Sequence, residues 1–244
     1  MADDIVATYS ALLDAENQER SHKQEHYHAS SAGMCIRKHY FAVTEGVKQN
    51  PPDESSLRRL RLGTIVHTDI QRSFLPPLNN PPNKDIYLIE ESIYIKELNV
   101  SGRIDFYNKE TKQLTDLKTI GGYKWQKLFG RYGDTSSVEN YKMQLGTYAA
   151  GIEETLGLPV EQLFLLFYKL GDPKASDMRS LEVPLEYKQK ALDYWGEVNR
   201  LSGDGPPPIK IGSSPVESWE CSPKWCPFFE HCGGGLKPEL LENV

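Results

Sequence analysis

The sequence predicts an α/β fold in which a mixed β-sheet is flanked by helices. Helix-spaced segments open the chain, three β-rich runs separated by short polar turns lie in its middle, and the consecutive apolar residues 164–167 indicate a strand buried on both faces. Strands followed by helices in this order build helix-covered sheets. We expect a single domain, made of an N-terminal helical region (1–53), a core (54–202) and a cysteine-rich tail (203–244).

The composition is that of an ordinary globular protein. Of the 244 residues, 39% are hydrophobic and 25% are charged, and no apolar run has the length needed to cross a bilayer. Residues 1–15 lack the basic cluster and apolar stretch of a secretory signal, so we expect a cytoplasmic location, or the host cytoplasm if the source is viral. The net charge of -6 argues against a protein that coats nucleic acid by charge alone, so DNA contacts must be local.

Three helices are predicted in the first part of the chain. Ser30 or Ser31 is a suitable N-cap for the second helix, which Gly46 would end. Cys35 would then lie in the first turns of this helix, and His67 in the second half of the next one. The expected ranges are 3–20, from 30 or 31 to about 45, and 54–74.

The rest of the chain alternates between strands and helices. A proline-containing loop at 79–83 precedes runs with β propensity, which short turns would join into an antiparallel meander. A stiff connector at 203–208 follows the last helix. The expected strands are 86–98, 100–108, 113–120, 162–170 and 181–184, and the expected helices are 123–129, 138–156 and 186–201.

Two carboxylates and a lysine form the sharpest local pattern. If the loop 109–112 closes a regular hairpin, Asp105 is paired across the strands with Asp116. Cross-strand neighbours have Cβ atoms about 4.5–5.5 Å apart, close enough for both acids to bind one cation. Lys118 lies on the same face as Asp116, because side chains alternate along a strand. A divalent ion with a nearby lysine is suited to phosphodiester hydrolysis, although a solvated, salt-bridged sheet face would give the same short motif.

Taken in chain order, these residues resemble the RecB-like branch of the PD-(D/E)XK nucleases. The resemblance runs from a helical histidine through Gly-x-x-Asp and Asp-x-Lys to Gln-x-x-x-Tyr, and it implies a restriction-endonuclease-like sheet. In that branch the histidine and the two acids bind Mg²⁺ or Mn²⁺, the lysine is catalytic, and the glutamine and tyrosine lie beside the site and the DNA. These roles fall on His67, Asp105, Asp116, Lys118, Gln144 and Tyr148.

The four cysteines are divided between the two ends of the chain. In a cytoplasmic protein, cysteines are more often metal ligands than disulfide partners. The division of one and three resembles the iron-sulfur nucleases that include the CRISPR-associated Cas-four family and the AddB nuclease domain, which implies a 4Fe-4S cluster joining the two ends. Structural zinc is the competing reading, with His231 as an alternative ligand. The expected cluster ligands are Cys35, Cys221, Cys226 and Cys232.

A basic and aromatic segment follows the candidate catalytic strand. Lysine and arginine can follow phosphates and aromatic rings can stack on bases, although the rings of an amphipathic helix could equally face the core. We expect DNA contacts from Lys124, Trp125, Lys127 and Arg131.

The function expected from these features is that of a deoxyribonuclease. The family implies an exonuclease that acts on DNA ends or single strands, in repair, recombination or CRISPR adaptation. A separate helicase, recombination or CRISPR-adaptation protein is the expected partner, and an oligomer is compatible with this reading. The alternatives are a non-cleaving iron-sulfur DNA-binding or adaptor module, and a zinc-stabilised interaction protein with a coincidental acidic sheet.

Overall fold

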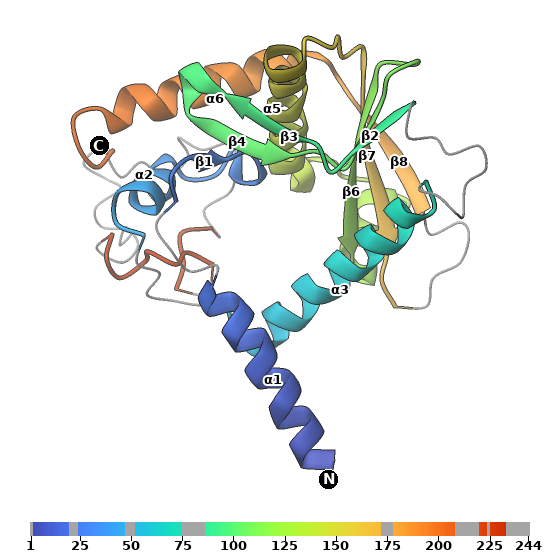
Figure 1. Cartoon of the computed structure of the whole chain (residues 1–244), viewed down its shortest axis with the longest axis vertical. Helices are drawn as coiled ribbons and strands as arrows, with labels where there is room; N and C mark the ends of the chain where they lie inside the picture. The colour runs from blue at the N-terminus through green and yellow to red at the C-terminus, as the bar shows by residue number, and fades with distance from the viewer. Residues whose placement is uncertain are drawn as a thin grey trace. The chain divides into compact units, whose positions relative to one another are not determined.

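The computed structural model of the chain describes residues 2–19, 24–46, 52–74, 86–171, 178–207, 220–223 and 225–232. The chain divides into two compact units. Unit 1 is drawn from residues 1–25, 34–64 and 201–244, and unit 2 from residues 26–33 and 65–200 (Figure 1). Two of the boundaries between the units fall inside helices, at 64/65 in α3 (Glu54–Arg72) and at 200/201 in α6 (Glu186–Ser202).

No helix in the described ranges is both long enough and apolar enough to span a membrane.

Unit 2 contains a five-stranded mixed sheet. The two long central strands are parallel to each other, and side chains on both of their faces are fully buried, such as Leu117 on one face and Leu165 and Phe167 on the other. The remaining pairs are antiparallel. The strand order is β2 (Tyr87–Ile89), β5 (Phe106–Asn108), β6 (Gln113–Ile120), β7 (Gln162–Lys169) and β8 (Met178–Val183). The predicted α/β class is confirmed, with β8 starting three residues earlier than expected.

A second sheet in unit 2 has three strands and corrects the prediction of one sheet. In it β4 (Val100–Arg103) lies between β1 (Tyr27–His28), which is parallel to it, and β3 (Ser92–Ile95), which is antiparallel. The expected strand 86–98 is interrupted at Glu90, whose φ of 56° is left-handed, and ends in a 3-10 turn, Lys96–Leu98. The prediction of one continuous strand over 86–98 was wrong, because the backbone turns at this point and passes from one sheet to the other.

The expected strand 100–108 also divides, between Arg103 and Phe106. The amide of Ile104 donates a hydrogen bond to the carbonyl of Glu91, and the side chain of Asp105 accepts a hydrogen bond from the amide of Leu117. A carboxylate therefore replaces the backbone acceptor with which the ladder would have continued. The first half of the run consequently joins the three-stranded sheet and the second half joins the five-stranded sheet.

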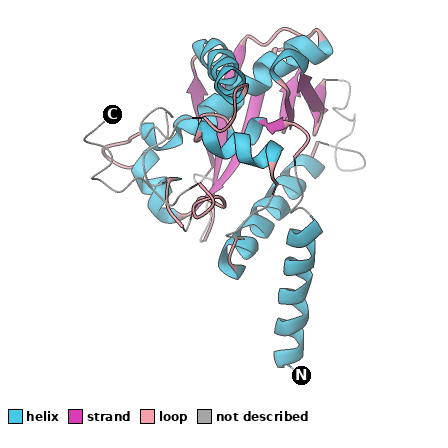
Figure 2. Cartoon of the chain, turned by 90° about the vertical axis from the view of Figure 1, so that its left-hand side faces the viewer, coloured by secondary structure: helices cyan, strands magenta, loops and turns pink. Residues whose placement is uncertain are grey.

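Helices cover both sheets of unit 2 (Figure 2). The long helix α5 (Glu139–Leu156) packs on strands of both sheets and ends at Gly157, which has a left-handed φ of 66° as expected of a helix C-cap. Trp195 of α6 is fully buried, stacks on Tyr27 and donates to Thr147 of α5. The shorter α4 (Gly122–Phe129) follows β6, and the 3-10 turn Ser136–Val138 leads into α5.

Unit 1 contains α1 (Ala2–Glu19), α2 (Ile36–Thr44) and the first part of α3. Polar contacts join α1 to α3: Ser10 donates to Glu54 at 2.7 Å, and Arg61 pairs with Glu16 at 2.6 Å. The second helix begins later than predicted, because Ser31 belongs to a 3-10 turn (Ala29–Ser31) that precedes a left-handed Gly33. Cys35 is consequently the N-cap of α2 rather than a residue of its first turns.

Part of what the sequence predicts falls beyond the described ranges. The loop at 79–83 lies outside them, as do residue 208 of the connector and much of the tail.

Candidate active site and cysteine pocket

The strand β6 carries two of the candidate catalytic side chains at the centre of the five-stranded sheet. Its register with β5 pairs Asn108 with Gln113 and Phe106 with Thr115, which confirms the register predicted from the loop length. Asp105 immediately precedes β5, opposite Asp116 in the continuation of this register. The alternation of the strand places Leu117 in the core and Asp116 and Lys118 together on the opposite face.

Asp105 connects the sheet to helix α3. One carboxylate oxygen, Oδ2, accepts a hydrogen bond from the amide of Leu117 at 2.7 Å. The other, Oδ1, lies 3.3 Å from Nδ1 of His67. Burial lowers the pKa of His67, but the hydrogen bond and the negative charge of Asp105 outweigh burial and raise it above its usual value. The histidine predicted on the helix and the acid predicted on the sheet are therefore neighbours.

Asp116 and Lys118 form a buried ion pair, with 2.7 Å between Oδ2 and Nζ. Burial raises the pKa of Asp116 to about 6, and the charge of Lys118 opposes this rise. Burial lowers the pKa of Lys118, but the two nearby carboxylates outweigh it and raise that pKa above its ordinary value. Despite the ion pair, Oδ2 of Asp116 accepts no well-directed hydrogen bond from any residue that the structure describes.

Helix α5 supports the site from the side. The amide group of Gln144 donates to the hydroxyl of Tyr148 at 2.8 Å, and its nitrogen lies 3.4 Å from Oδ1 of Asp116. Both α5 side chains are buried, and burial raises the pKa of Tyr148. The ring of Tyr148 packs directly against Gly102, where an added Cβ would lie 2.7 Å from a ring carbon. The glycine of the Gly-x-x-Asp pattern thus leaves room for the tyrosine of the Gln-x-x-x-Tyr pattern.

Sequence reasoning missed a polar network next to these residues. Gln71 lies one turn after His67 on α3, is buried, and donates a hydrogen bond to Glu90. Arg103 pairs with the same carboxylate at 2.8 Å. The signal that could have revealed Gln71 is its spacing of four residues from His67, which places both side chains on one helix face.

The donor set of the site suits a divalent cation. Two carboxylates and an imidazole are hard and borderline ligands of the kind that hold Mg²⁺ or Mn²⁺, and a buried carboxylate oxygen without a well-directed hydrogen bond remains at Asp116. The acids are now paired with His67 and Lys118. Within the described ranges, no group of three or more His, Cys, Asp or Glu side chains is already arranged around a position for a metal ion.

The predicted DNA-contacting segment divides into buried and exposed residues. Trp125 is buried and packs on Phe129 with ring centroids 4.7 Å apart, so its expected role in base stacking is replaced by a role in the core. The reason is its position three residues before the buried Leu128 on the inner face of α4. The exposed aromatic residues of this segment are instead Tyr123 and Tyr132, which have 87% and 83% of their surfaces accessible.

The three cations of the segment have different surroundings. Lys124 contacts the hydroxyl of Tyr141, and Lys127 lies 3.4 Å from a carboxylate oxygen of Asp134. The guanidinium of Arg131 lies over the ring of its exposed neighbour Tyr132, 5.5 Å from the centroid.

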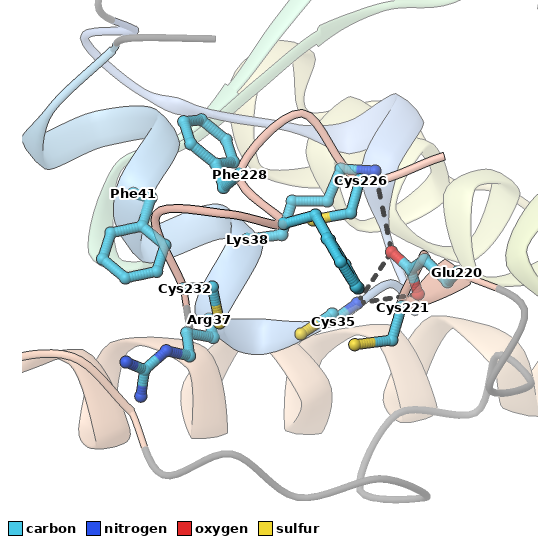
Figure 3. Close-up of a pocket in the computed structure, with 10 residues that line it drawn as sticks. Cys35, Arg37, Lys38, Phe41, Glu220, Cys221, Cys226, Phe228 and Cys232 are labelled. Carbon is cyan, nitrogen blue, oxygen red and sulfur yellow. Dashed lines mark hydrogen bonds and ion pairs between the residues drawn. The ribbon is translucent and has the colours of Figure 1, made fainter. Parts of the chain in front are cut away.

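In unit 1 all four cysteines line a single pocket (Figure 3). Cys35 comes from the start of α2 and the other three from residues 221–232, and the cavity between them measures about 30 Å³. Phe41, Phe228 and Phe229 provide apolar walls. Burial raises the pKa of Cys35 to about 11, so without a ligand it stays a protonated thiol at neutral pH. Four thiols are a chemically suitable donor set for an iron-sulfur cluster, but among the described residues no three of them are already arranged around a position for a metal ion.

A carboxylate holds the two ends of this pocket together. Both oxygens of Glu220 lie 3.1 Å from the amide nitrogen of Cys35, so the residue before Cys221 caps helix α2. Lys38 lies 3.6 Å from the same carboxylate. His231, the alternative zinc ligand, is not among the residues that line the pocket and pairs with Glu45 at 2.5 Å.

Fold and site together define an α/β protein with a carboxylate, lysine and histidine cluster on its central sheet. No known family profile matches the sequence, and no curated protein matches it. Among solved structures, the crystal structure of SSO0001 matches with a TM-score of 0.54 and 16% identity, over 97% of this chain and 98% of that chain. This likeness shows a common fold.

Two further solved structures align less well. One is a "putative exonuclease" from Eubacterium rectale, with a TM-score of 0.38 and 12% identity over 69% of this chain and 65% of that chain. The other is an alkaline exonuclease from Laribacter hongkongensis, with a TM-score of 0.40 and 9% identity over 72% of this chain and 93% of that chain.

Proposed function

We propose that the protein is a metal-dependent deoxyribonuclease that hydrolyses phosphodiester bonds at DNA ends or in single strands. The observation that carries this proposal is the convergence on one face of the sheet of four side chains from strand β6, the residue before β5 and helix α3, namely Asp116, Lys118, Asp105 and His67. A solvated sheet face would leave these side chains exposed and separate, whereas Asp105 and Asp116 are 8% and 2% exposed. The resemblance to RecB-like nucleases gives the same residues the same roles.

In this proposal Asp105, Asp116 and His67 would hold Mg²⁺ or Mn²⁺. When bound, such an ion polarises the phosphate and lowers the pKa of a coordinated water. Lys118 keeps its proton at neutral pH, because two carboxylates surround it, and it can therefore stabilise negative charge that develops on the phosphate. Gln144 orients the carboxylate of Asp116, and Tyr148 in turn fixes Gln144.

The DNA strand would follow the segment after β6. Lys124, Lys127 and Arg131 are assigned to phosphates, because charge-neutralising contacts supply most non-specific affinity for nucleic acids. The exposed rings of Tyr123 and Tyr132 are suited to stacking on unpaired bases. A single strand offers both phosphates and free base faces, so these residues favour single-stranded DNA or frayed ends.

The four cysteines are proposed to hold a 4Fe-4S cluster. The common lining of one pocket supports this, and the positive charges of Lys38 and Arg37 beside it suit a cluster with anionic thiolate ligands. When bound, such a cluster ties its ligands together and can exchange electrons. A structural zinc is the rival occupant. The proposed setting is the cytoplasm, with DNA repair, recombination or CRISPR-adaptation proteins, or a separate helicase, as partners.

Digestion of end-labelled single-stranded DNA with Mn²⁺ tests the nuclease proposal. We expect wild-type protein to shorten the label progressively, and Asp116→Ala and Lys118→Ala to lose at least about 100-fold in rate, the scale of removing a group that stabilises the transition state. Lys112→Ala is the matched control. This exposed lysine immediately precedes β6, and its ammonium pairs with the carboxylate of Glu161. A protein that binds DNA but cleaves it in no variant would be the non-cleaving adaptor.

Metal analysis of anaerobically purified protein tests the cluster. We expect a brown protein with close to four irons per chain, and loss of iron and colour in Cys35→Ser and Cys226→Ser. The Asp116→Ala variant should keep its iron, because that residue belongs to the other unit. A colourless protein with one zinc per chain would establish the rival occupant.

A further inference from the structure

The ring of Tyr141 lies close to the ammonium groups of two lysines. Nζ of Lys118 is 5.1 Å from the ring centroid and Nζ of Lys124 is 4.3 Å from it. The ammonium of Lys124 also donates a hydrogen bond to the Tyr141 hydroxyl at 3.3 Å. Tyr141 stands in the first turn of α5, three residues before Gln144, so one helix presents it beside the candidate active site.

The two lysines differ in how their charge is compensated. Lys118 has the carboxylate of Asp116 at 2.7 Å. Lys124 is half-buried, and its polar partner is the neutral hydroxyl of Tyr141, with no carboxylate of the described residues in ion-pair distance. An aromatic face returns only about 0.5–2 kcal/mol to a cation. The charge of Lys124 is thus the less compensated of the two, and such a cation attracts an anion.

We propose that Lys124 and Tyr141 form a phosphate subsite for the phosphodiester next to the one that is cleaved. The inference rests on the proposed function, because it takes Lys118 as the residue at the cleaved bond. Both ammonium groups lie within about 5 Å of the same ring, so a strand with one phosphate at Lys118 brings its neighbour toward Lys124. Lys124 binds this second phosphate, and Tyr141 is the positioning residue that aims the lysine.

Salt-dependent binding measures the phosphate contact without any cleavage. A fluorescently labelled single-stranded oligonucleotide is titrated by anisotropy in EDTA at several salt concentrations. Each phosphate contact contributes about 0.7 to the slope of log affinity against log salt for single strands, so Lys124→Gln is expected to reduce the magnitude of the slope by about 0.7. It should also weaken binding about tenfold at low salt, whereas Lys124→Arg keeps the charge and should retain the slope.

A matched control separates this contact from a general loss of charge. Lys190 also lies over a tyrosine ring, 4.5 Å from the centroid of Tyr187, but it has Glu186 at 2.6 Å. Lys190→Gln is therefore expected to bind like the wild type. If Lys124→Gln and Lys190→Gln show the same slope and affinity, the subsite is refuted. A Lys124→Gln protein that fails to fold is replaced by Tyr141→Leu, which should lose part of the same slope because the lysine is no longer aimed.

A comparison of two substrates places the contact next to the cleaved bond. Lys124→Gln is expected to raise KM for the oligonucleotide about tenfold, whereas bis-p-nitrophenyl phosphate has a single phosphodiester and its Mn²⁺-dependent hydrolysis should lose much less. Equal losses on both substrates would refute the subsite and place Lys124 at the cleaved bond itself. A wild type that binds the oligonucleotide and cleaves neither substrate overturns the proposed function, and the slope comparison still decides whether Lys124 holds a phosphate.

Discussion

Replacing Gly102 with alanine probes the contact on which the geometry of the candidate site depends. The new Cβ would lie 2.7 Å from a ring carbon of Tyr148 and 2.9 Å from the Cβ of Ala29, and side-chain carbons do not approach so closely without a shift. Neither neighbour can retreat easily, since Ala29 is fully buried and the hydroxyl of Tyr148 is held by Gln144. Overpacking of this kind costs about 1–3 kcal/mol.

The expected consequence is a loss of both stability and activity. For a chain of this size each kcal/mol lowers the melting temperature by about 2–4 °C, so Gly102→Ala should melt roughly 2–12 °C below the wild type in a calorimetric scan. Displacement of the Tyr148 ring also moves Gln144 away from Asp116, so single-strand cleavage should slow severalfold in the protein that remains folded.

A glycine in open space provides the control for this substitution. Apart from its chain neighbours and its own helix backbone, no described atom lies within 4 Å of the Cβ position of Gly196 in α6, so Gly196→Ala should raise stability by about 0.5–1 kcal/mol through helix propensity alone. A Gly102→Ala protein that melts with the wild type and cleaves at the same rate would refute the packing argument.

Three further predictions concern buried groups. Tyr107→Phe removes the 2.6 Å hydrogen bond from a fully buried hydroxyl to the carbonyl of Pro159, so the unfolding free energy in urea should fall by about 1 kcal/mol with activity kept, and an unchanged midpoint would contradict this. Because burial raises the pKa of Asp116 from 3.8 to about 6, the folded state holds that proton more tightly than the unfolded chain. As the pH rises from about 4 to about 6, the unfolding free energy of the metal-free wild type should therefore fall by up to about 3 kcal/mol relative to that of Asp116→Asn. Parallel curves of unfolding free energy against pH for the two proteins would argue against the assignment. Burial raises the pKa of Cys35 from 9.0 to about 11, so in ligand-free protein at pH 8 iodoacetamide should alkylate it about a hundredfold more slowly than in urea, and equal rates by mass spectrometry would exclude such burial.

Local patterns were sufficient to predict the hairpin but not the break in its strand. The loop 109–112 sets the pairing of Asn108 with Gln113, and all residues further along the hairpin follow from that register. The interruption before Phe106 depends on the side chain of Asp105 reaching the amide of Leu117, a contact between strands that no periodicity records. The division into two sheets follows from that contact and was therefore not predictable.

The candidate site shows the same difference between local and distant information. Gln144 and Tyr148 were predicted to share a helix face from their spacing alone, and they are hydrogen-bonded. The cap of helix α2 could not be predicted, because Glu220 comes from 185 residues further along the chain. The burial of Trp125 was accessible in principle, since its spacing of three from Leu128 marks the inner face of α4.

Unit 1 is built from three separate segments of the chain, and this has a consequence for synthesis on the ribosome. Cys35 emerges about 200 residues before Cys232, which at 5–20 residues per second is a delay of roughly 10–40 s. The whole of unit 2 has been translated once residue 200 is added, so it can fold before Cys221, Cys226 and Cys232 have been synthesised to join Cys35 in the pocket. In a nascent chain the candidate active site can thus form before the cysteine pocket. Assembly of the pocket is the later step, and it is the one that depends on oxidants and on the supply of metal.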